Sequence, residues 1–399
     1  MDTKRALENS KHYLMDTYKR FPAVMTKGRG TKVWSSDNVE YLDFVCGVAT
    51  NVLGHCYPKV VVALQKQAQR LMHVSNLYHI EPQIKLARIL VEHSFADKAF
   101  FCNSGTEAVE GAIKLARKYS IAKGKAERFE IIAAENSFHG RTMGALSATG
   151  QDKMKAGFGP LVPGFKHVPY NDAEAIKNAI TPNTCAVLLE PIQGEYGVRI
   201  PSEDYLRKVR TICSDNGILL ILDEVQTGIG RTGKLFGYEH TGITPDIMAL
   251  AKGLGGGMPI GAVLATAEVA AAFSPGDHGS TFGGNPLACA AGAATLEAIL
   301  ENGLILDQCQ RMGMYLKMKL DGLKSKHPTP VKEIRGKGLL VAMELNVECA
   351  DIAAAAFEKG LMINCTAGST LRFMPPLIVQ ENEIDQAISV LDDIFKSRH

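Results

Sequence analysis

Residues 246–266 read DIMALAKGLGGGMPIGAVLAT, so that Lys252 stands between two apolar runs and Gly253, Gly255, Gly256 and Gly257 follow it closely. Apolar surroundings disfavour a charged ammonium group, which lowers the pKa of the lysine and makes its amine a nucleophile. Glycines let the backbone pass close to a bulky neighbour. A lysine that reaches solvent from a loop is the alternative, and this stretch leaves both open.

Short apolar runs alternate with helical stretches on both sides of Lys252. Strands are predicted at 99–102, 131–134, 186–189, 218–222, 247–251 and 260–265, with helices such as 107–121 and 205–215 between them. Strands that are apolar on both faces and separated by helices indicate a mostly parallel sheet covered on each side. The chain is therefore predicted to be an α/β protein.

The chain has 399 residues, which is too long for one small core. A helical piece and a hairpin are expected within residues 1–55, and the large domain within 56–300. Beyond a connecting helix at 301–325, HPTPV is typical of a linker. Further strands are predicted at 339–345, 361–365 and 370–373, and helices at 350–359 and 381–396. Residues 1–55 and 301–399 are thus expected to build one small α+β domain.

Charge and composition argue against several kinds of partner. The net charge of +2 gives no reason to expect nucleic acid or an anionic membrane. No apolar run approaches the roughly 20 residues that span a bilayer, and the N-terminal residues lack the apolar segment of a signal peptide. The nine cysteines are scattered without a CxxC pair, which favours reduced thiols in a cytoplasmic protein. No HxxH or HExxH pattern indicates a metal.

Residues 228–234, GIGRTGK, satisfy the spacing of a dinucleotide fingerprint and nearly that of a phosphate loop. The residues DEVQT separate Gly228 from the preceding strand, whereas the fingerprint needs its first glycine at the end of the strand. The phosphate loop needs Ser or Thr after Lys234, and this chain has Leu235. A flexible glycine loop near a site is the better interpretation.

Asp223 and Glu224 follow five aliphatic residues, at the edge of the sheet where ligands of parallel sheets bind. A carboxylate there could be a metal ligand, a general base, a partner for a buried cation or only a helix cap. Residues 103–107, NSGTE, open the next helix, where free N–H groups can bind an anion and a capping role is the alternative.

Residues 138–141, FHGR, follow the strand at 131–134. Phe138 could stack on a planar ligand and Arg141 could bind a carboxylate through two parallel hydrogen bonds. With Lys252, Asp223 and the anion site at Gly105 and Thr106, these residues favour one ligand, pyridoxal phosphate. That cofactor needs a lysine Schiff base and an acidic partner for its ring nitrogen.

The sequence resembles the class III aminotransferases of fold type I, and most closely their bacterial acetylornithine aminotransferase branch. The resemblance covers nearly the whole chain and is carried by FFCNSGTEA, FHGRTMGALSATGQ, EPIQGEYGV, LDEVQTGIGRTGKLFGYE, ALAKGLGGGMPIGA and STFGGNPLA, among other segments.

For the cofactor, the resemblance implies that Lys252 forms the Schiff base and then carries a proton. It also implies that Asp223 holds the ring nitrogen protonated, Gln226 contacts the ring hydroxyl and Phe138 stacks on the ring. Gly105 and Thr106 would bind the phosphate.

For the assembly and the substrates, the resemblance implies that Thr281 reaches the phosphate of a neighbouring subunit, which makes the protein a homodimer with shared active sites. Ser280 and Arg141 match positions that contact the substrate. Arg372 and Glu195 resemble a pair in which the glutamate masks the arginine until 2-oxoglutarate or glutamate binds. Such a switch lets one site accept two dissimilar substrates.

The expected reaction converts N²-acetyl-L-ornithine and 2-oxoglutarate to N-acetyl-L-glutamate 5-semialdehyde and L-glutamate in arginine biosynthesis. Residues 46–53 lack the tyrosine that ornithine aminotransferases tend to carry, which favours the acylated amine. Succinylornithine, N-succinyl-diaminopimelate, ornithine and 4-aminobutyrate are alternative amines. A cofactor-binding regulator or an inactive relative is the alternative outside enzymes.

Overall fold

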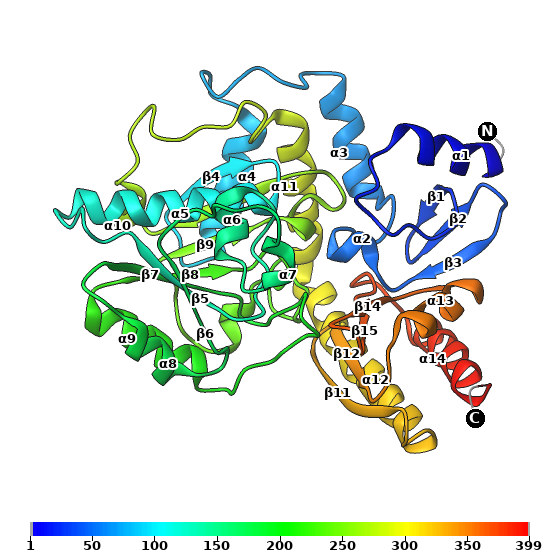
Figure 1. Ribbon diagram of the computed structural model, residues 1–399. Helices are drawn as coiled ribbons and strands as arrows, with labels where there is room; N and C mark the ends of the chain where they lie inside the picture. The colour runs from blue at the N-terminus through cyan, green and yellow to red at the C-terminus, as the bar shows by residue number, and fades with distance from the viewer. Residues whose placement is uncertain (1–2, 398–399) are drawn as a thin grey trace.

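The structure is a computed structural model that describes residues 3–397, and its centre is a seven-stranded sheet (Figure 1). The strand order is β4-β10-β9-β8-β7-β5-β6, and β10 alone runs antiparallel to its neighbours. The strands are β4 (Lys98–Cys102), β5 (Glu130–Ala134), β6 (Phe165–Val168), β7 (Thr184–Leu189), β8 (Leu219–Asp223), β9 (Ile247–Leu250) and β10 (Gly261–Ala265). The predicted mostly parallel sheet is confirmed; β6, which has only four residues, was not predicted.

Both faces of this sheet are buried, as the apolar runs indicate. Along β8, Leu219 and Ile221 belong to the core beside α5 (Gly105–Ala122), whereas Leu220 and Leu222 belong to the core beside α9 (Tyr205–Asn216). Neighbouring residues of a strand point to opposite faces, so a strand between two helical layers must be apolar throughout.

The small domain is built from both ends of the chain, as predicted. One sheet has the order β1-β2-β3-β13, in which β13 pairs in parallel with β3 across more than 300 residues of sequence. The other has the order β11-β12-β15-β14. The strands are β1 (Met25–Arg29), β2 (Lys32–Ser35), β3 (Glu40–Asp43), β11 (Val331–Lys337), β12 (Leu340–Leu345), β13 (Leu361–Met362), β14 (Asn364–Thr366) and β15 (Thr370–Phe373).

One expectation about this region was wrong in detail. The predicted strand at 361–365 is two strands in different sheets, because β13 pairs with β3 while β14 pairs with β15. The predicted linker at 327–331 does connect the helix that ends at Lys326 to β11, except that Val331 is already the first residue of that strand. The domain boundaries at residues 55 and 300 stay a prediction.

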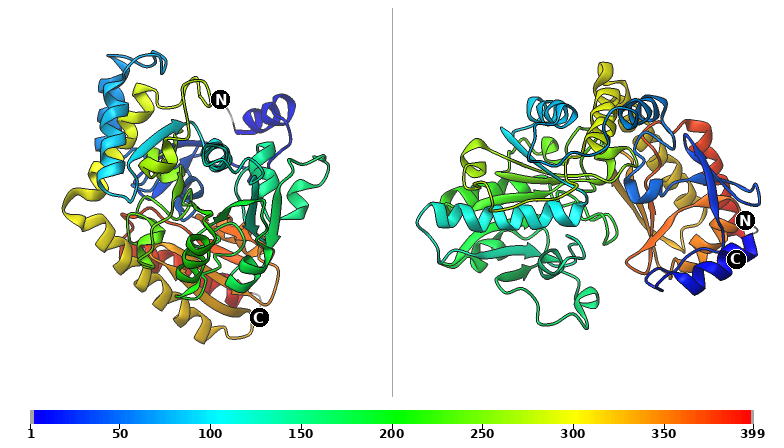
Figure 2. Two further views of the ribbon diagram at one scale, coloured as in Figure 1. Left: turned by 90° about the vertical axis from the view of Figure 1, so that its left-hand side faces the viewer. Right: turned by 90° about the horizontal axis from the view of Figure 1, so that it is seen from above.

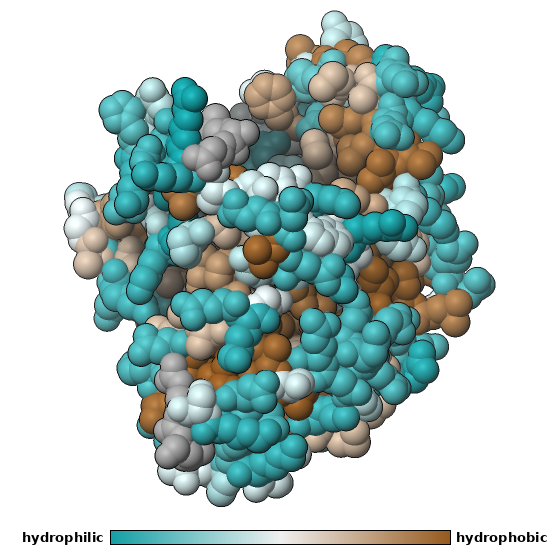
Figure 3. Space-filling model, turned by 90° about the vertical axis from the view of Figure 1, so that its right-hand side faces the viewer, coloured by the Kyte–Doolittle hydropathy of each residue, from teal (hydrophilic) through white to brown (hydrophobic). Residues whose placement is uncertain are grey.

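The two domains lie side by side, and α1 and α14 are both on the right in Figure 1 and in the right-hand view of Figure 2. The other helices are α1 (Thr3–Tyr13), α2 (Cys46–Ala49), α3 (Pro58–Ala68), α4 (Glu81–Glu92), α6 (Met143–Ala148), α7 (Asp152–Lys155), α8 (Ala173–Ala179), η1 (Gly237–His240), η2 (Lys252–Gly255), α10 (Ala267–Ala270), α11 (Pro286–Leu300), η3 (Glu301–Gly303), α12 (Leu304–Lys326), α13 (Ala350–Glu358) and α14 (Glu381–Lys396). The face that carries the small domain is mostly hydrophilic, with separate apolar patches (Figure 3). Scattered patches of that kind are ordinary on a protein surface.

The segment Pro286–Lys326 is long and apolar enough to cross a membrane, with a mean hydropathy of 1.3 in its most apolar window. This differs from the expectation drawn from the sequence. Within it, α11 is a core helix that packs against α3 and α4, and it buries Cys289, Leu296 and Ile299. Core helices of this kind meet the same length and composition criteria.

The cysteines also differ from expectation, because Cys349 and Cys365 form a disulfide. The bond joins the residue before α13 to β14. The other seven cysteines are free, and of these only Cys56 is exposed. The interpretation of all nine as reduced thiols was therefore wrong for one pair.

Candidate active site

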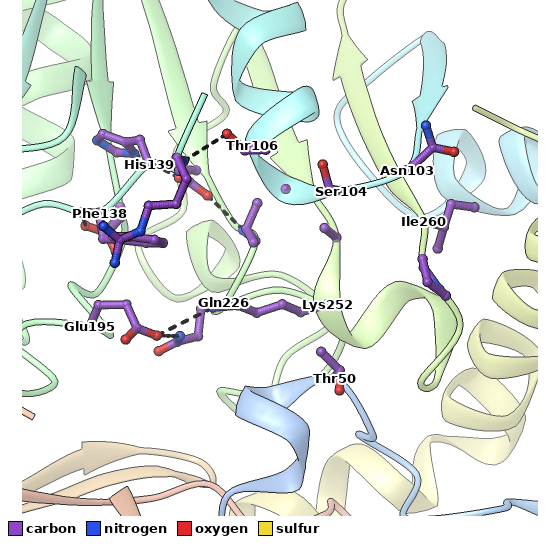
Figure 4. Close-up of a pocket in the computed structure, with 18 of the residues that line it drawn as sticks. Thr50, Asn103, Ser104, Thr106, Phe138, His139, Glu195, Gln226, Lys252 and Ile260 are labelled. Carbon is purple, nitrogen blue, oxygen red and sulfur yellow. Dashed lines mark hydrogen bonds and ion pairs between the residues drawn. The ribbon is translucent and has the colours of Figure 1, made fainter. Parts of the chain in front are cut away.

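A cavity of about 410 Å³ lies at the carboxyl edge of the parallel strands. Eight residues that the sequence predicted for one site line it together: Gly105, Thr106, Phe138, Arg141, Glu195, Asp223, Gln226 and Lys252. They come from separate elements and loops, and Figure 4 shows that the Lys252 side chain points toward Gln226 and Glu195. The strand ends bring them together because parallel strands release their loops at one edge.

Lys252 begins η2, two residues after β9 ends at Leu250. Its φ of 39° lies in the left-handed region, which is strained for a residue other than glycine and is found preferentially at functional sites. Its Nζ lies 3.7 Å from Glu195 Oε1, and its side chain is 18% exposed. Burial lowers the pKa of Lys252, although Glu195 partly opposes the shift. The lysine is therefore directed into the cavity and does not extend into solvent.

The glycines after Lys252 admit neighbours from the same chain. A Cβ on Gly253 would lie 2.6 Å from Val52, and a Cβ on Gly257 would lie 2.5 Å from the Asn51 side chain. The segment before α3 therefore packs directly on the lysine loop. The sequence correctly predicted a close approach of the backbone but did not identify this neighbour.

Asp223 is the last residue of β8 and is 4% exposed. Its Oδ2 lies 2.8 Å from His139 Nδ1, and its Oδ1 accepts a hydrogen bond from the Val225 N–H at 3.0 Å. The adjacent Glu224 points elsewhere, where it accepts bonds from the N–H groups of Gly237 and Tyr238 and supports the fold. Only Asp223 of the two faces the cavity.

The helix α5 begins at the cavity and is capped by Ser104, whose side chain accepts a hydrogen bond from the Glu107 N–H. The first N–H groups of a helix have no partner within it and favour an anion. A Cβ on Gly105 would lie 2.7 Å from Val225, so only glycine fits there. The Thr106 hydroxyl accepts bonds from the N–H groups of Arg141 and Thr142, which fixes the neighbouring loop.

Phe138 and Arg141 lie on that loop, with the Arg141 guanidinium 5.5 Å above the Phe138 ring. The Phe138 N–H donates to Glu190 Oε2 at 3.2 Å, which holds the aromatic residue in place. Glu190 is 6% exposed, and burial together with the nearby Asp223 raises its pKa well above the usual value. Glu190 is therefore a buried carboxyl group beside Asp223 whose ionisation is disfavoured.

Glu195, Gln226 and Arg372 form a connected group. Glu195 Oε1 lies 2.9 Å from Arg372 Nη1 and accepts a hydrogen bond from Gln226 Nε2 at 2.7 Å. Arg372 Nη1 also donates to the Gly194 carbonyl at 2.7 Å. Burial alone would raise the pKa of Glu195, but attraction to Arg372 and Lys252 lowers it to about 2. The carboxylate thus stays ionised at neutral pH.

Arg372, Ser280 and Thr281 do not line this cavity. Arg372 lies behind Glu195, and Ser280 Oγ accepts a hydrogen bond from Asn103 Nδ2, whose residue does line the cavity. Thr281 is exposed outside it. The sequence predicted these three as site residues, and the fold brings only Arg372 and Ser280 close to the cavity.

Two residues of the site were not identified from the sequence. His139 lies within the FHGR segment and Glu190 opens the EPIQGEYGV segment, but the sequence predicts no role for either residue. Their importance follows from burial and from their partners Asp223 and Phe138, which only the folded chain reveals. A single sequence gives no signal for such contacts.

This arrangement fits pyridoxal phosphate. The cavity offers one buried amine, a carboxylate at the end of a central strand, an anion-binding helix end beside a glycine cradle, and a fixed aromatic side chain. His139 lines the cavity, and its Nε2 is buried without a partner among residues 3–397, which is consistent with a polar site that a ligand completes. The fold and site therefore define a pyridoxal-phosphate-dependent enzyme of fold type I.

The chain belongs to the class-III aminotransferases, because the sequence model of that family matches residues 13–395. It is 58% identical over 386 residues to an acetylornithine aminotransferase of Caldanaerobacter subterraneus subsp. tengcongensis, covering 96% of this chain and 98% of the relative. It is 51% identical to the acetylornithine aminotransferase of Methanocaldococcus jannaschii, covering 99% of each.

Solved structures show the same fold. The ornithine aminotransferase of Toxoplasma gondii ME49 superposes with a TM-score of 0.95 at 35% identity, covering 100% of this chain and 96% of that one. The acetylornithine aminotransferase of Elizabethkingia anophelis gives a TM-score of 0.89 at 33% identity and covers 100% of each chain. The protein is thus an enzyme, an aminotransferase whose family cofactor is pyridoxal phosphate.

Proposed function

We propose that the enzyme transfers the distal amino group of N²-acetyl-L-ornithine to 2-oxoglutarate, forming N-acetyl-L-glutamate 5-semialdehyde and L-glutamate in arginine biosynthesis. The observation that carries this proposal is the Glu195–Arg372 ion pair beside Lys252, at 2.9 Å. Acetylornithine has no carboxylate next to the carbon that carries the reacting amino group, whereas glutamate has one. An arginine that is masked for acetylornithine and exposed for glutamate suits both substrates.

Pyridoxal phosphate supplies an electron sink for the carbanion that forms when the substrate loses a proton. Lys252 is the residue that would hold its aldehyde carbon and, when displaced, move the proton. Asp223, fixed by His139, would hold the ring nitrogen protonated, and the start of α5 at Gly105 and Thr106 would bind the phosphate. Phe138 would cover one face of the ring.

The Glu195–Arg372 ion pair would be closed in the half-reaction with the amine and open in the half-reaction with glutamate or 2-oxoglutarate. When the ion pair is closed, the charges of Glu195 and Arg372 cancel each other, and the cavity beside Lys252 accepts an alkyl amine. When glutamate or 2-oxoglutarate enters, its α-carboxylate would displace Glu195 and pair with Arg372 through charged hydrogen bonds. Gln226 already bonds Glu195, so it would respond to the same movement. Arg141, exposed at the other side of the cavity, would take the distal carboxylate with help from Ser280.

Ornithine is the main rival as the amine, because several of the similar solved structures are ornithine aminotransferases. Their identity to this chain is 35% and 33%, against 58% for the acetylornithine relative, which supports the acylated substrate. Comparing kcat/KM for acetylornithine, succinylornithine, N-succinyl-diaminopimelate, ornithine and 4-aminobutyrate tests the proposal. A clear preference for ornithine or 4-aminobutyrate would overturn it. A regulator without activity is disfavoured by the family and by the intact lysine site.

A homodimer is supported by the surface around Thr281. Exposed apolar side chains gather on the neighbouring segments: Leu71, Met72, Leu77, Tyr78, Ile84 and Phe282. Asn76 Nδ2 donates to the Ser280 and Gly283 carbonyls, so these segments form one surface. Contiguous apolar surface of this kind is typical of a protein interface. Thr281 lies within it, in a position to serve the site of a second copy.

Complementation tests the shared site. Lys252→Ala and Thr281→Ala subunits are co-expressed with different tags, and the mixed dimer is purified. If Thr281 serves the partner, the mixed dimer has one intact site of two and about half of the wild-type activity. If each site uses its own Thr281, the mixed dimer carries a defect in both sites and is no more active than the dimers of either variant alone.

A cytoplasmic location stays a prediction, and the Cys349–Cys365 disulfide weighs against it because such bonds are rare in reducing compartments.

A further inference from the structure

A second cavity, of about 630 Å³, lies between the two domains and apart from Lys252. The large domain contributes Arg207 from α9, Lys234 from the loop after β8 and His240 from η1. The small domain contributes Lys317 from α12 and Lys337 from the end of β11. Figure 1 shows α9 and α12 on opposite sides of this boundary.

Cations outnumber carboxylates in the lining of this cavity, and Glu239, outside the lining, interacts with Lys234. Within residues 3–397, none of Arg207, Lys234, Lys317 and Lys337 forms an ion pair, and Glu203 is the one carboxylate among the lining residues. Lys317 and Lys337 are half-buried, so their charges are partly removed from water. Burial lowers the pKa of His240 to about 4, and Lys337 and Lys234 add to this shift. The lining therefore carries an excess of positive charge, with Arg207 and Lys234 exposed and Lys317 and Lys337 half-buried.

The floor of the cavity is rigid. The Leu339 N–H donates to the Arg231 carbonyl at 3.1 Å, and Gln310 Nε2 donates to the Gly233 carbonyl at 2.7 Å. A Cβ on Gly338 would lie 2.4 Å from the Thr232 carbonyl carbon, so the backbones of the two domains touch. The GIGRTGK loop thus has a structural role, since it carries Lys234 on this floor and presents it to the cavity.

An ordinary solvated surface explains these features poorly. Lysines that only keep a protein soluble are exposed and intermingled with acidic residues, whereas Lys317 is held with its Nζ 3.3 Å from the Gly336 carbonyl. Pro191, Ile200 and Met314 add apolar surface to the same cavity. Such a combination suits a small organic molecule with several negative charges.

We propose that this cavity between the domains binds a small multivalent anion of the phosphate or polycarboxylate type. Arg207 and Lys234 contact it from one domain, and Lys317 and Lys337 contact it from the other. Because both domains contribute, the bound anion stabilises their docked arrangement. The binding is independent of the amine substrate and of the proposed reaction.

The test uses the holoenzyme, so that the cofactor occupies its own phosphate site. Inorganic pyrophosphate and citrate are titrated separately by calorimetry and in thermal unfolding, with sodium chloride of matched ionic strength as the blank. Saturable binding and a rise of the melting temperature are expected for at least one of them, and the stronger of the two identifies phosphate or carboxylate chemistry. Lys234→Gln, Lys337→Gln and their combination should each weaken binding, the pair by about tenfold.

Lys177→Glu on α8 is the control, since Lys177 is exposed and does not line the cavity. It should leave the Kd unchanged, and all these variants should keep their transaminase activity, which shows that they are folded. Three results would overturn the proposal: binding without saturation, equal loss in Lys177→Glu, or competition of the anion with 2-oxoglutarate, which would place it in the Lys252 cavity. The outcome does not depend on which amine the enzyme uses.

Discussion

The Glu195 carboxylate stands between two cations, with its Oε1 2.9 Å from Arg372 Nη1 and 3.7 Å from Lys252 Nζ. Arg372 comes from β15 of the small domain, and Lys252 follows β9 of the large one. One carboxylate therefore joins the proposed substrate switch to the catalytic amine across the boundary between domains.

Replacing Glu195 by Gln should alter substrate choice more than it alters the chemistry. Without the carboxylate, Arg372 is permanently available to an α-carboxylate and is left as an uncompensated charge for the alkyl amine. We expect kcat/KM for acetylornithine to fall by roughly 10-fold or more, and that for glutamate to change much less. The two half-reactions are measured separately by the absorbance of the cofactor. An equal loss in both would show that Glu195 does not discriminate between substrates.

The same variant has a defined pH dependence of stability. The pKa of Glu195 is lowered to about 2 in the folded protein from an ordinary value of 4.5, so the ionised carboxylate stabilises the fold above about pH 4.5 and this contribution is lost as the pH falls toward 2. At pH 7, Glu195→Gln should lower the free energy of unfolding by about 3 kcal/mol. The difference from wild type should shrink when the melting temperatures are compared at pH 3.5, and a constant difference would contradict the assignment.

Lys252→Ala should abolish turnover. The variant lacks both the amine that holds the cofactor and the proton carrier, and loss of a general acid–base group alone costs about 10²- to 10⁴-fold in rate. The absorbance band of the covalently held cofactor, near the edge of the visible range, should disappear. Lys208→Ala, which removes an exposed lysine of α9 paired with Asp204, is the control and should keep both properties. A Lys252→Ala protein that turns over normally would refute the mechanism.

His139→Asn should show whether His139 positions Asp223. The His139–Asp223 bond of 2.8 Å is buried, and losing a hydrogen bond to a charged group costs about 1.5–3 kcal/mol, equivalent to roughly 10- to 100-fold in kcat. The pH titration of the cofactor absorbance should shift as well, because Asp223 would hold the ring nitrogen less firmly. His167→Asn is the control, since His167 bonds the Ala148 carbonyl outside this cavity. A change in stability without a spectral shift would mean that His139 is only structural.

Arg335→Ala should destabilise the contact between the domains. Arg335 Nε donates to the Gly197 carbonyl at 3.0 Å, and its Nη1 lies 2.6 Å from Glu344 Oε2, so it attaches the loop that carries Glu195 to the small domain. Removing one partner of a buried pair costs about 3–5 kcal/mol. Lys332→Ala breaks an ion pair of 2.7 Å to the same Glu344, but its side chain is 59% exposed, and the expected cost is below about 1 kcal/mol. Thermal unfolding of both variants checks this difference, and equal effects would contradict it.

The sequence alone determined the large sheet and most of the cofactor cavity. Runs such as 218–222 are apolar on every residue, which leaves a strand buried on both faces as the consistent solution. Once these strands are parallel, their loops must meet at one edge, and Lys252, Asp223, Gly105 and Phe138 do meet there. These features were predictable because the local sequence indicates both the burial of a strand and, through the helices between strands, the direction in which the next strand runs.

Only the tertiary structure decided the contacts between distant segments. The division of residues 361–365 between two sheets depends on β3 and β15, which lie far away in sequence. His139 beside Asp223, Glu190 under Phe138 and Arg335 on Gly197 are pairs whose energy comes from burial. The positive cavity between the domains likewise appears only when α9 and α12 face each other across the boundary. A local pattern does not predict which distant residues come into contact, because the packing of the whole chain determines those contacts.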